Sequence, residues 1–130
     1  MPNQARHRYP MECLGEGRVR IGGSFAPNGS SALAAAGMYG TTGWTAAYTS
    51  TGLYTVTLDD VWLYLLDWSL GFAMVTATDV VPQLGLVDLP AKTIQIRSLA
   101  VATVTDIAAD AANRISFGFV FKRSGNSGKR

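Results

Sequence analysis

The alternation of hydrophobic and polar residues along the chain predicts β-strands. The clearest case is residues 113–124, where Ile115, Phe117, Phe119 and Phe121 follow one another at two-residue spacing, which places all four side chains on one face of a strand. We expect this last strand to lie in the interior of a sheet. The same pattern, or a richness in aromatic and β-branched residues, predicts further strands at residues 17–25, 44–49, 53–58, 66–76 and 92–104.

Turn-forming residues separate these strands. Ser50, Thr51 and Gly52 supply a reversal between two strands, which predicts a β-hairpin over residues 44–58. Residues 26–43 are rich in glycine and small side chains, so we expect a long loop, in which residues 30–37 could form a short helix.

Two later segments are harder to assign. Residues 79–92 contain Pro82, Gly85 and Pro90, so any strand there is expected to be short, at a sheet edge or within an irregular loop. Residues 105–113 begin with Thr105 and Asp106, which are suited to cap a helix, and continue with alanines, so we expect one or two helical turns.

Six to eight short strands with almost no helix predict an all-β fold. We expect an antiparallel β-sandwich, jelly-roll-like or Greek-key in topology. The chain of 130 residues is of the size of one domain. We divide it into an extended N-terminal arm over residues 1–16, a sandwich body over residues 17–124 and a flexible basic tail over residues 125–130.

The composition indicates that the surface is poor in charge. Hydrophobic residues make up 48% of the chain and charged residues 15%, against about 25% charged residues in an average soluble domain. Apolar or merely hydroxylated side chains must therefore face outward. Large exposed apolar patches usually mark contact with another protein, so we expect the subunits to associate.

Positive charge gathers near the two ends of the chain, at Arg6, Arg8, Lys122, Arg123, Lys129 and Arg130. Such ends could meet nucleic acid or an acidic protein, or they could be solvated tails. Nucleic acid is the less favoured partner, because no segment combines basic and aromatic residues densely. Residues 61–75 are apolar but too short to span a bilayer, which takes about 20 residues. We therefore expect no membrane partner and no signal peptide.

Residues suited to catalysis are few. His7, the only histidine, lies between two arginines in the arm. Cys13, the only cysteine, has no base near it in the sequence except His7 that could activate its thiol. A small hydrolase would need two carboxylates in one cleft, which Asp67, Asp79 or Asp88 could supply. The chain has no motif for phosphate, dinucleotide, zinc or calcium binding. We expect no enzymatic activity, no cofactor and no metal.

Aromatic residues are the remaining candidates for a binding site. Trp44, Trp62 and Trp68, with several tyrosines, could form a platform for carbohydrate. They could instead fill the core and the subunit interface, where such side chains are common. We favour the second interpretation and predict that Trp44, Trp62, Tyr64 and Trp68 contribute to an interface between subunits.

Two segments carry a resemblance to a known family. The hairpin positions are Gly52, Tyr54, Thr55, Val56, Leu58 and Asp59, and the last-strand positions are Asn113, Ile115, Ser116, Phe117, Arg123 and Ser124. They resemble a family of small virion proteins from tailed bacteriophages. The resemblance covers about residues 17–124. It implies a capsid decoration or cement protein that is made in the bacterial cytoplasm, forms homotrimers, and binds the major capsid protein on the outside of the shell.

The resemblance leaves the contact surface to be inferred from the residues. We expect the arm and the loop over residues 26–43 to touch the shell, through Arg6, Arg8, Tyr9, Met11, Leu33, Met38 and Tyr39. The alternative is a receptor- or glycan-binding module of a tail or head fibre, which predicts exposed tryptophan or tyrosine side chains in a concave site.

Overall fold

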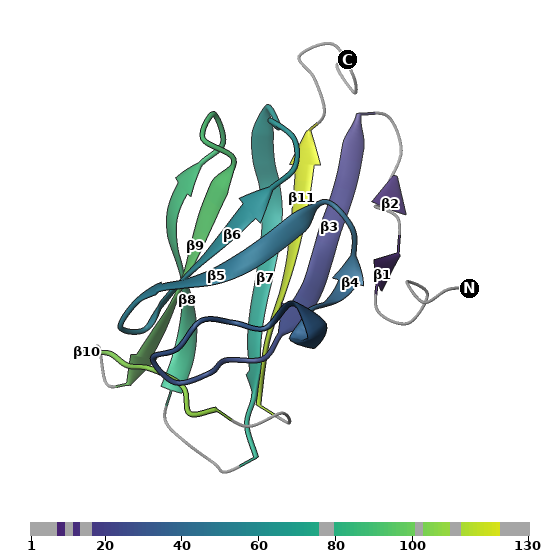
Figure 1. Cartoon of the computed structure of the whole chain (residues 1–130). Coiled ribbons are helices and arrows are strands. Elements are labelled where there is room, and N and C mark those ends of the chain that lie inside the picture. Colours follow the sequence, from purple (N-terminus) through teal and green to yellow (C-terminus); the bar gives the residue numbers. More distant parts are fainter. Residues whose placement is uncertain are drawn as a thin grey trace.

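The computed structural model describes residues 8–9, 12–13, 17–75, 80–100, 103–109 and 113–122, with the backbone alone at 8–9 and 12–13. In these residues the chain forms two β-sheets (Figure 1). The first sheet contains β1 (Arg8–Tyr9), β2 (Glu12–Cys13), β3 (Arg18–Phe25), β4 (Tyr39–Thr41), β7 (Tyr64–Ala73) and β11 (Arg114–Lys122). The second contains β5 (Trp44–Ser50), β6 (Leu53–Leu58), β8 (Val80–Asp88), β9 (Thr93–Ala100) and β10 (Thr103–Val104).

The order of the strands brings the first and last long strands together. In the first sheet the order is β4-β3-β11-β7, with β1 beside β4 and β2 pairing with β3. In the second sheet β5, β6, β9 and β8 follow one another, and β10 also pairs with β9. All these pairs are antiparallel except β1 with β4. The all-β antiparallel sandwich is therefore confirmed, as is the interior position of the last strand.

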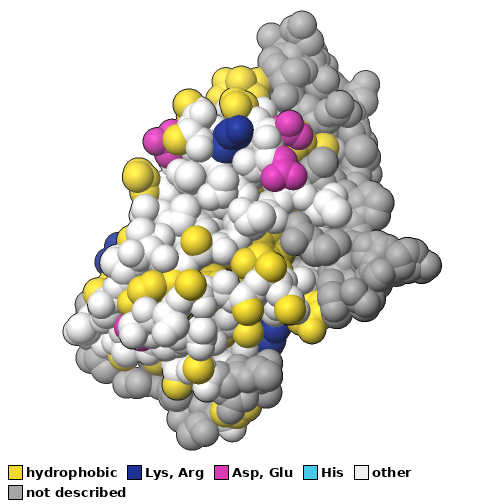
Figure 2. Space-filling view, viewed as in Figure 1, with side chains coloured by type: hydrophobic (Ala, Val, Ile, Leu, Met, Phe, Trp, Pro, Cys, Tyr) yellow, Lys and Arg dark blue, Asp and Glu magenta, His cyan; other side chains and the backbone are white. Residues whose placement is uncertain are grey.

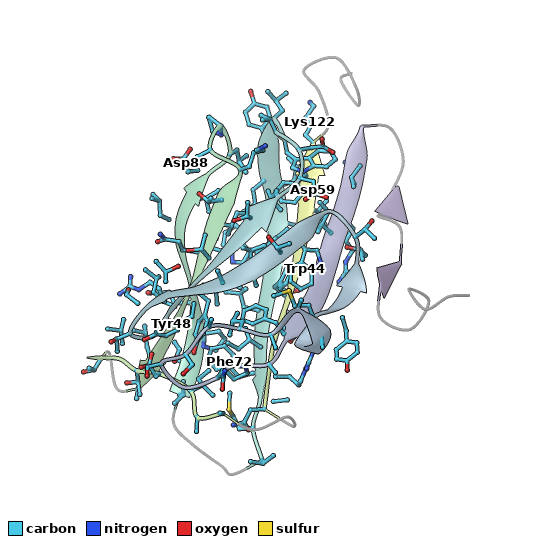
Figure 3. All side chains as sticks on the ribbon, viewed as in Figure 1. Trp44, Tyr48, Asp59, Phe72, Asp88 and Lys122 are labelled. Carbon is cyan, nitrogen blue, oxygen red and sulfur yellow. The ribbon has the colours of Figure 1, made fainter. Side chains whose placement is uncertain are left out.

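The hydrophobic core lies between the two sheets. Phe25 of the first sheet packs against Tyr54 of the second with ring centroids 5.8 Å apart, and Trp44 meets Phe117 edge-on at 4.8 Å. Figure 3 shows Trp44 in the interior between the sheets. The apolar stripe of β11 is buried throughout, from Ile115 to Phe121. Burial of these rings and of the aliphatic core residues stabilises the fold through the hydrophobic effect.

On one side the chain itself joins the two sheets. β4 ends at Thr41 in the first sheet, and β5 begins at Trp44 in the second. Gly23 and Gly40 are paired at this crossing, and a Cβ atom on Gly23 would lie 2.2 Å from the carbonyl oxygen of Tyr39. Gly40 has a φ of 126°, which side chains disfavour. Two glycines therefore permit the close approach that closes this side.

The predicted helices do not form in the described residues. The loop over residues 26–43 contains only a 3₁₀ turn, η1 (Ala35–Gly37), together with strand β4. Residues 105–109 have no regular secondary structure, and Asp106 accepts hydrogen bonds from Gly52 N and from the Tyr48 hydroxyl instead of capping a helix. Residues 110–112 lie outside the described part.

The uncertain segment 79–92 forms a longer strand than expected. β8 spans nine residues. It does lie at a sheet edge, and its register shifts between Leu84 and Val87. The N-terminal arm contributes β1 and β2, each of two residues, to the first sheet.

Candidate functional site

The side opposite the chain crossing carries the candidate site. Here β7 ends the first sheet and β8 ends the second. Between them lies a groove, which we call the edge groove. Its lining residues are Leu63, Tyr64, Leu65, Trp68, Leu84, Val87, Leu89 and Pro90. Among the described residues β7 and β8 do not pair with each other, and apolar side chains line the groove between them; we call this the open side of the sandwich.

A tryptophan just before β7 determines how this strand begins. Trp62 is buried and stacks on Phe121 with centroids 5.5 Å apart and planes 17° from parallel. The backbone N–H of Leu63 donates to the carbonyl of Lys122 at 3.0 Å. Because Trp62 is turned inward, its neighbours Val61 and Leu63 are left exposed.

The side chains of β7 are exposed on both faces. A register shift in the pairing with β11 falls at Leu66, after which residues 67–73 pair regularly. Trp68 lies opposite Phe119, on the inner face, yet it is 51% exposed. Leu66 and Asp67 line a second hollow with Arg18 and Val120. The strand therefore presents apolar surface both into the groove and away from it.

Exposed hydrophobic residues concentrate around this side of the molecule. Apart from Tyr39 and Val104, the large ones among the described residues lie between Val61 and Leu86. Tyr64 and Leu86 are 57% and 63% exposed. By contrast, the face shown in Figure 2 carries few charged side chains and only small groups of hydrophobic ones. Such a concentration is typical of a surface that contacts another macromolecule.

The predicted interface residues divide into two kinds. Tyr64 and Trp68 are exposed and line the edge groove. Trp44 and Trp62, which are 1% and 7% exposed, are part of the core of this chain. Leu63, Leu66 and Leu86 were missed by the sequence analysis. The run of apolar residues from Val61 onward was the available signal, but it gave no indication of which residues face solvent.

The residues expected to touch the shell are only partly described. Arg6 and Met11 lie outside the described residues, and for Arg8 and Tyr9 the backbone alone is described. Leu33 is half-buried, Met38 is buried and Tyr39 is exposed. These last three lie on the segment that includes η1 and β4.

Arg114 fixes this segment to the first sheet. Its guanidinium donates to Ser24 Oγ and to the carbonyl of Gly37, both at 2.8 Å, and lies 4.7 Å from the centre of the Tyr39 ring. Burial lowers the pKa of Arg114, and the nearby Tyr39 opposes this shift. The exposed Tyr39 ring therefore packs against the guanidinium of Arg114.

Two of the three carboxylates that could serve a hydrolase are described, and each accepts a local hydrogen bond. Asp67 Oδ1 accepts from the backbone N–H of Trp68 at 2.9 Å, and Asp88 Oδ1 accepts from that of Ala91 at 3.2 Å. Asp79 and His7 lie outside the described residues, as does the side chain of Cys13. Figure 3 shows that Asp59 and Asp88 come from separate elements.

Within the described part of the chain, no group of three or more histidine, cysteine, aspartate or glutamate residues could hold a metal ion. No helix in that part is long and apolar enough to cross a membrane.

Comparisons with protein-family models, with curated proteins and with solved structures find no match to this chain. The account of its function therefore depends on the surface described above and on the resemblance noted in the sequence.

Proposed function

We propose that this chain is a capsid decoration protein of a tailed bacteriophage, located in the virion. In this proposal it binds the major capsid protein on the outside of the shell, and it bridges neighbouring capsomers and stabilises them. It acts through contacts between proteins and carries out no reaction. The resemblance in the hairpin and the last strand supports the virion assignment.

One structural observation carries the proposal: the exposed apolar surface along the open side of the sandwich. A charge-poor chain that leaves Tyr64, Trp68 and Leu86 in water gains free energy when another protein covers them. The described carboxylates next to this surface satisfy backbone amides. Both features favour a protein built for assembly.

The proposal assigns different surfaces to the two kinds of contact. The arm and the segment around Tyr39 face the shell, where Arg6 and Arg8 meet acidic groups of the capsid protein. The open side, with Tyr64 and Trp68, faces other copies of the chain. The two contacts can therefore be tested separately.

A glycan-binding module is the second candidate, and one observation favours it. Tyr64 and Trp68 are exposed and line one groove, as that function requires. The other lining residues are leucines, a valine and a proline. A sugar site needs polar groups that hydrogen-bond the hydroxyls, so the groove suits an apolar protein surface better than a sugar.

Co-sedimentation with capsids tests the proposal. Shells of the phage that encodes this chain, stripped of it, are mixed with increasing amounts of purified chain. We expect saturable binding. Replacing Arg6 and Arg8 by alanine weakens binding, whereas replacing Lys129 and Arg130, which removes the same charge, leaves it nearly unchanged. Absence of saturable binding by the native chain would rule out the decoration role, and binding to a glycan array would favour the alternative.

A further inference from the structure

We infer that β7 pairs with β7 of a second copy of this chain, antiparallel and about a two-fold axis, so that the first sheet continues from one copy into the other. This inference goes beyond the proposed function, because it concerns a contact that the purified chain makes by itself. It rests on the free edge of β7, on the pattern of its side chains and on the surface around it.

The outer edge of β7 is open to pairing. Among the described residues, only β11 pairs with β7. The backbone N–H of Trp68 donates to the carboxylate of Asp67, which shows that it does not point toward β11. Backbone groups alternate between the two edges of an antiparallel strand. Leu70 and Phe72 therefore also direct their N–H and C=O groups to the open edge.

The other edge beside the groove is protected, but β7 is not. β8 contains Pro82, which lacks an N–H, and a register shift between Leu84 and Val87. Both features discourage pairing with another strand. β7 has ten residues, no proline and no lysine, and Asp67 is its only charged residue. A long apolar edge of this kind is a template for a further strand.

The side chains of β7 are complementary to themselves. Residues 67–73, which pair regularly with β11, are centred on Leu70. A two-fold axis through Leu70 places Asp67 opposite Ala73, Trp68 opposite Phe72, and Ser69 opposite Gly71. Each aromatic pair forms twice, which favours cross-strand association. The two Asp67 carboxylates lie at opposite ends of the paired segment, about 20 Å apart at 3.4 Å per residue, so they do not repel strongly.

The exposed area is adequate for a specific contact. Aromatic side chains such as Tyr64 and Trp68 bury about 150–250 Å² each when fully covered. Because both are more than half exposed and line the edge groove with Leu63, Leu84 and Val87, the open side offers apolar surface on the order of several hundred Å² per copy. A standard interface takes about 800 Å² per partner, part of which the paired backbone supplies.

A second copy fits this edge better as a two-fold dimer than in the threefold ring that the resemblance implies. In a ring the contacts are between different surfaces, so β7 would have to pair with some other strand. The neighbouring edge, β8, is interrupted at Pro82 and at its register shift. Antiparallel pairing of β7 with β7 of a second copy does not involve β8. It gives hydrogen-bond partners to the outer backbone groups of β7 in both copies at once.

The test combines light scattering after size exclusion with hydrogen exchange on the full chain. We expect twice the mass of one chain, and slow exchange of the amides of Leu70 and Phe72, which face the outer edge of β7, that becomes faster on dilution. Trp68→Lys places a cation within the pair and weakens association by about tenfold or more. Val104→Lys, a matched change of an exposed residue on β10, leaves the dimer intact.

The exchange measurement on the native chain does not depend on any variant folding. A native monomer at high concentration, with fast exchange along the outer edge of β7, would overturn the inference. So would a trimer, or a dimer that Trp68→Lys does not weaken. None of these results bears on shell binding, so the failure of the dimer and the failure of the decoration role can be told apart.

Discussion

Trp68 and Phe119 lie opposite each other on neighbouring strands, but Phe119 is fully buried and Trp68 is half exposed. Both side chains are on the inner face of the first sheet. The difference arises because β11 lies in the interior of the first sheet. Among the described residues β7 is the edge strand of that sheet, and it borders the edge groove. Trp68 therefore points to the inner face but stays partly in contact with solvent, and a partner protein could bury it.

Removing the carboxylate of Asp67 is predicted to strengthen self-association. Asp67 Oδ1 occupies the N–H of Trp68, which a paired strand needs. In Asp67→Ala this N–H is free to pair. One hydrogen bond contributes about 0.5–1.5 kcal/mol net, and the two-fold dimer contains this N–H twice, so we expect dimerisation to tighten by roughly fivefold to a hundredfold in sedimentation analysis.

Asp59→Ala is the control for this change, because Asp59 is an exposed carboxylate outside β7. It removes the same charge and is expected to leave the association constant unaltered. An equal gain in both variants would show that net charge, and not the open edge, governs association.

The glycine at the crossing of the sheets is predicted to resist substitution. A Cβ atom on Gly23 would lie 2.2 Å from the backbone oxygen of Tyr39 and 2.7 Å from the Trp44 ring. Overpacking of this kind costs about 1–3 kcal/mol, so Gly23→Ala lowers the free energy of unfolding by that amount in urea titration. In Gly37→Ala the new atom is 3.4 Å from its nearest neighbour, and stability stays within about 0.5 kcal/mol. Equal stability of the two variants would contradict the close approach.

Tyr54 is predicted to make the fold sensitive to alkaline pH. Burial raises the pKa of Tyr54 above its ordinary value near 10, although a hydrogen bond from the Ile107 N–H to its hydroxyl oxygen opposes the rise. The unfolded chain therefore loses this proton at a lower pH than the folded chain. The contribution to stability is complete below about pH 10 and is lost as pH rises through the raised pKa.

Denaturant titrations at pH 8 to 11 measure this effect. We expect the free energy of unfolding to fall above pH 10 in the native chain and to fall less in Tyr54→Phe, which cannot ionise. Tyr48 lies next to Tyr54 with centroids 5.9 Å apart, and its pKa is also raised, chiefly by burial and by the bond to Asp106. Some pH dependence should therefore remain. An identical decline in both proteins would contradict the role of Tyr54.

Local pattern was sufficient to predict the fold class and the long strands other than β8, but not β4. The stripe from Ile115 to Phe121 requires one buried face, and the hairpin over residues 44–58 has strong turn and strand formers. The alanine-rich segments misled the prediction. Helix propensity is weak, and the hydrogen bonds that Asp106 accepts from the Gly52 N–H and the Tyr48 hydroxyl keep residues 105–109 out of a helix.

The candidate site could be predicted only in part. Trp62 and Trp68 lie in the same apolar run, so composition alone does not distinguish them. Trp62 is buried because it stacks on Phe121, and Trp68 is exposed because its strand is at a sheet edge. Which strand ends a sheet depends on contacts between distant parts of the chain, and neither spacing nor composition encodes that order locally.

The thermal stability of the shell tests the central claim most directly. Shells filled with DNA and stripped of this chain are heated with a dye that fluoresces on released DNA, with and without a saturating amount of the chain. The account predicts that the chain raises the temperature of DNA release, because bridged capsomers need more free energy to separate. An unchanged release temperature with the chain bound at saturation would contradict a stabilising role.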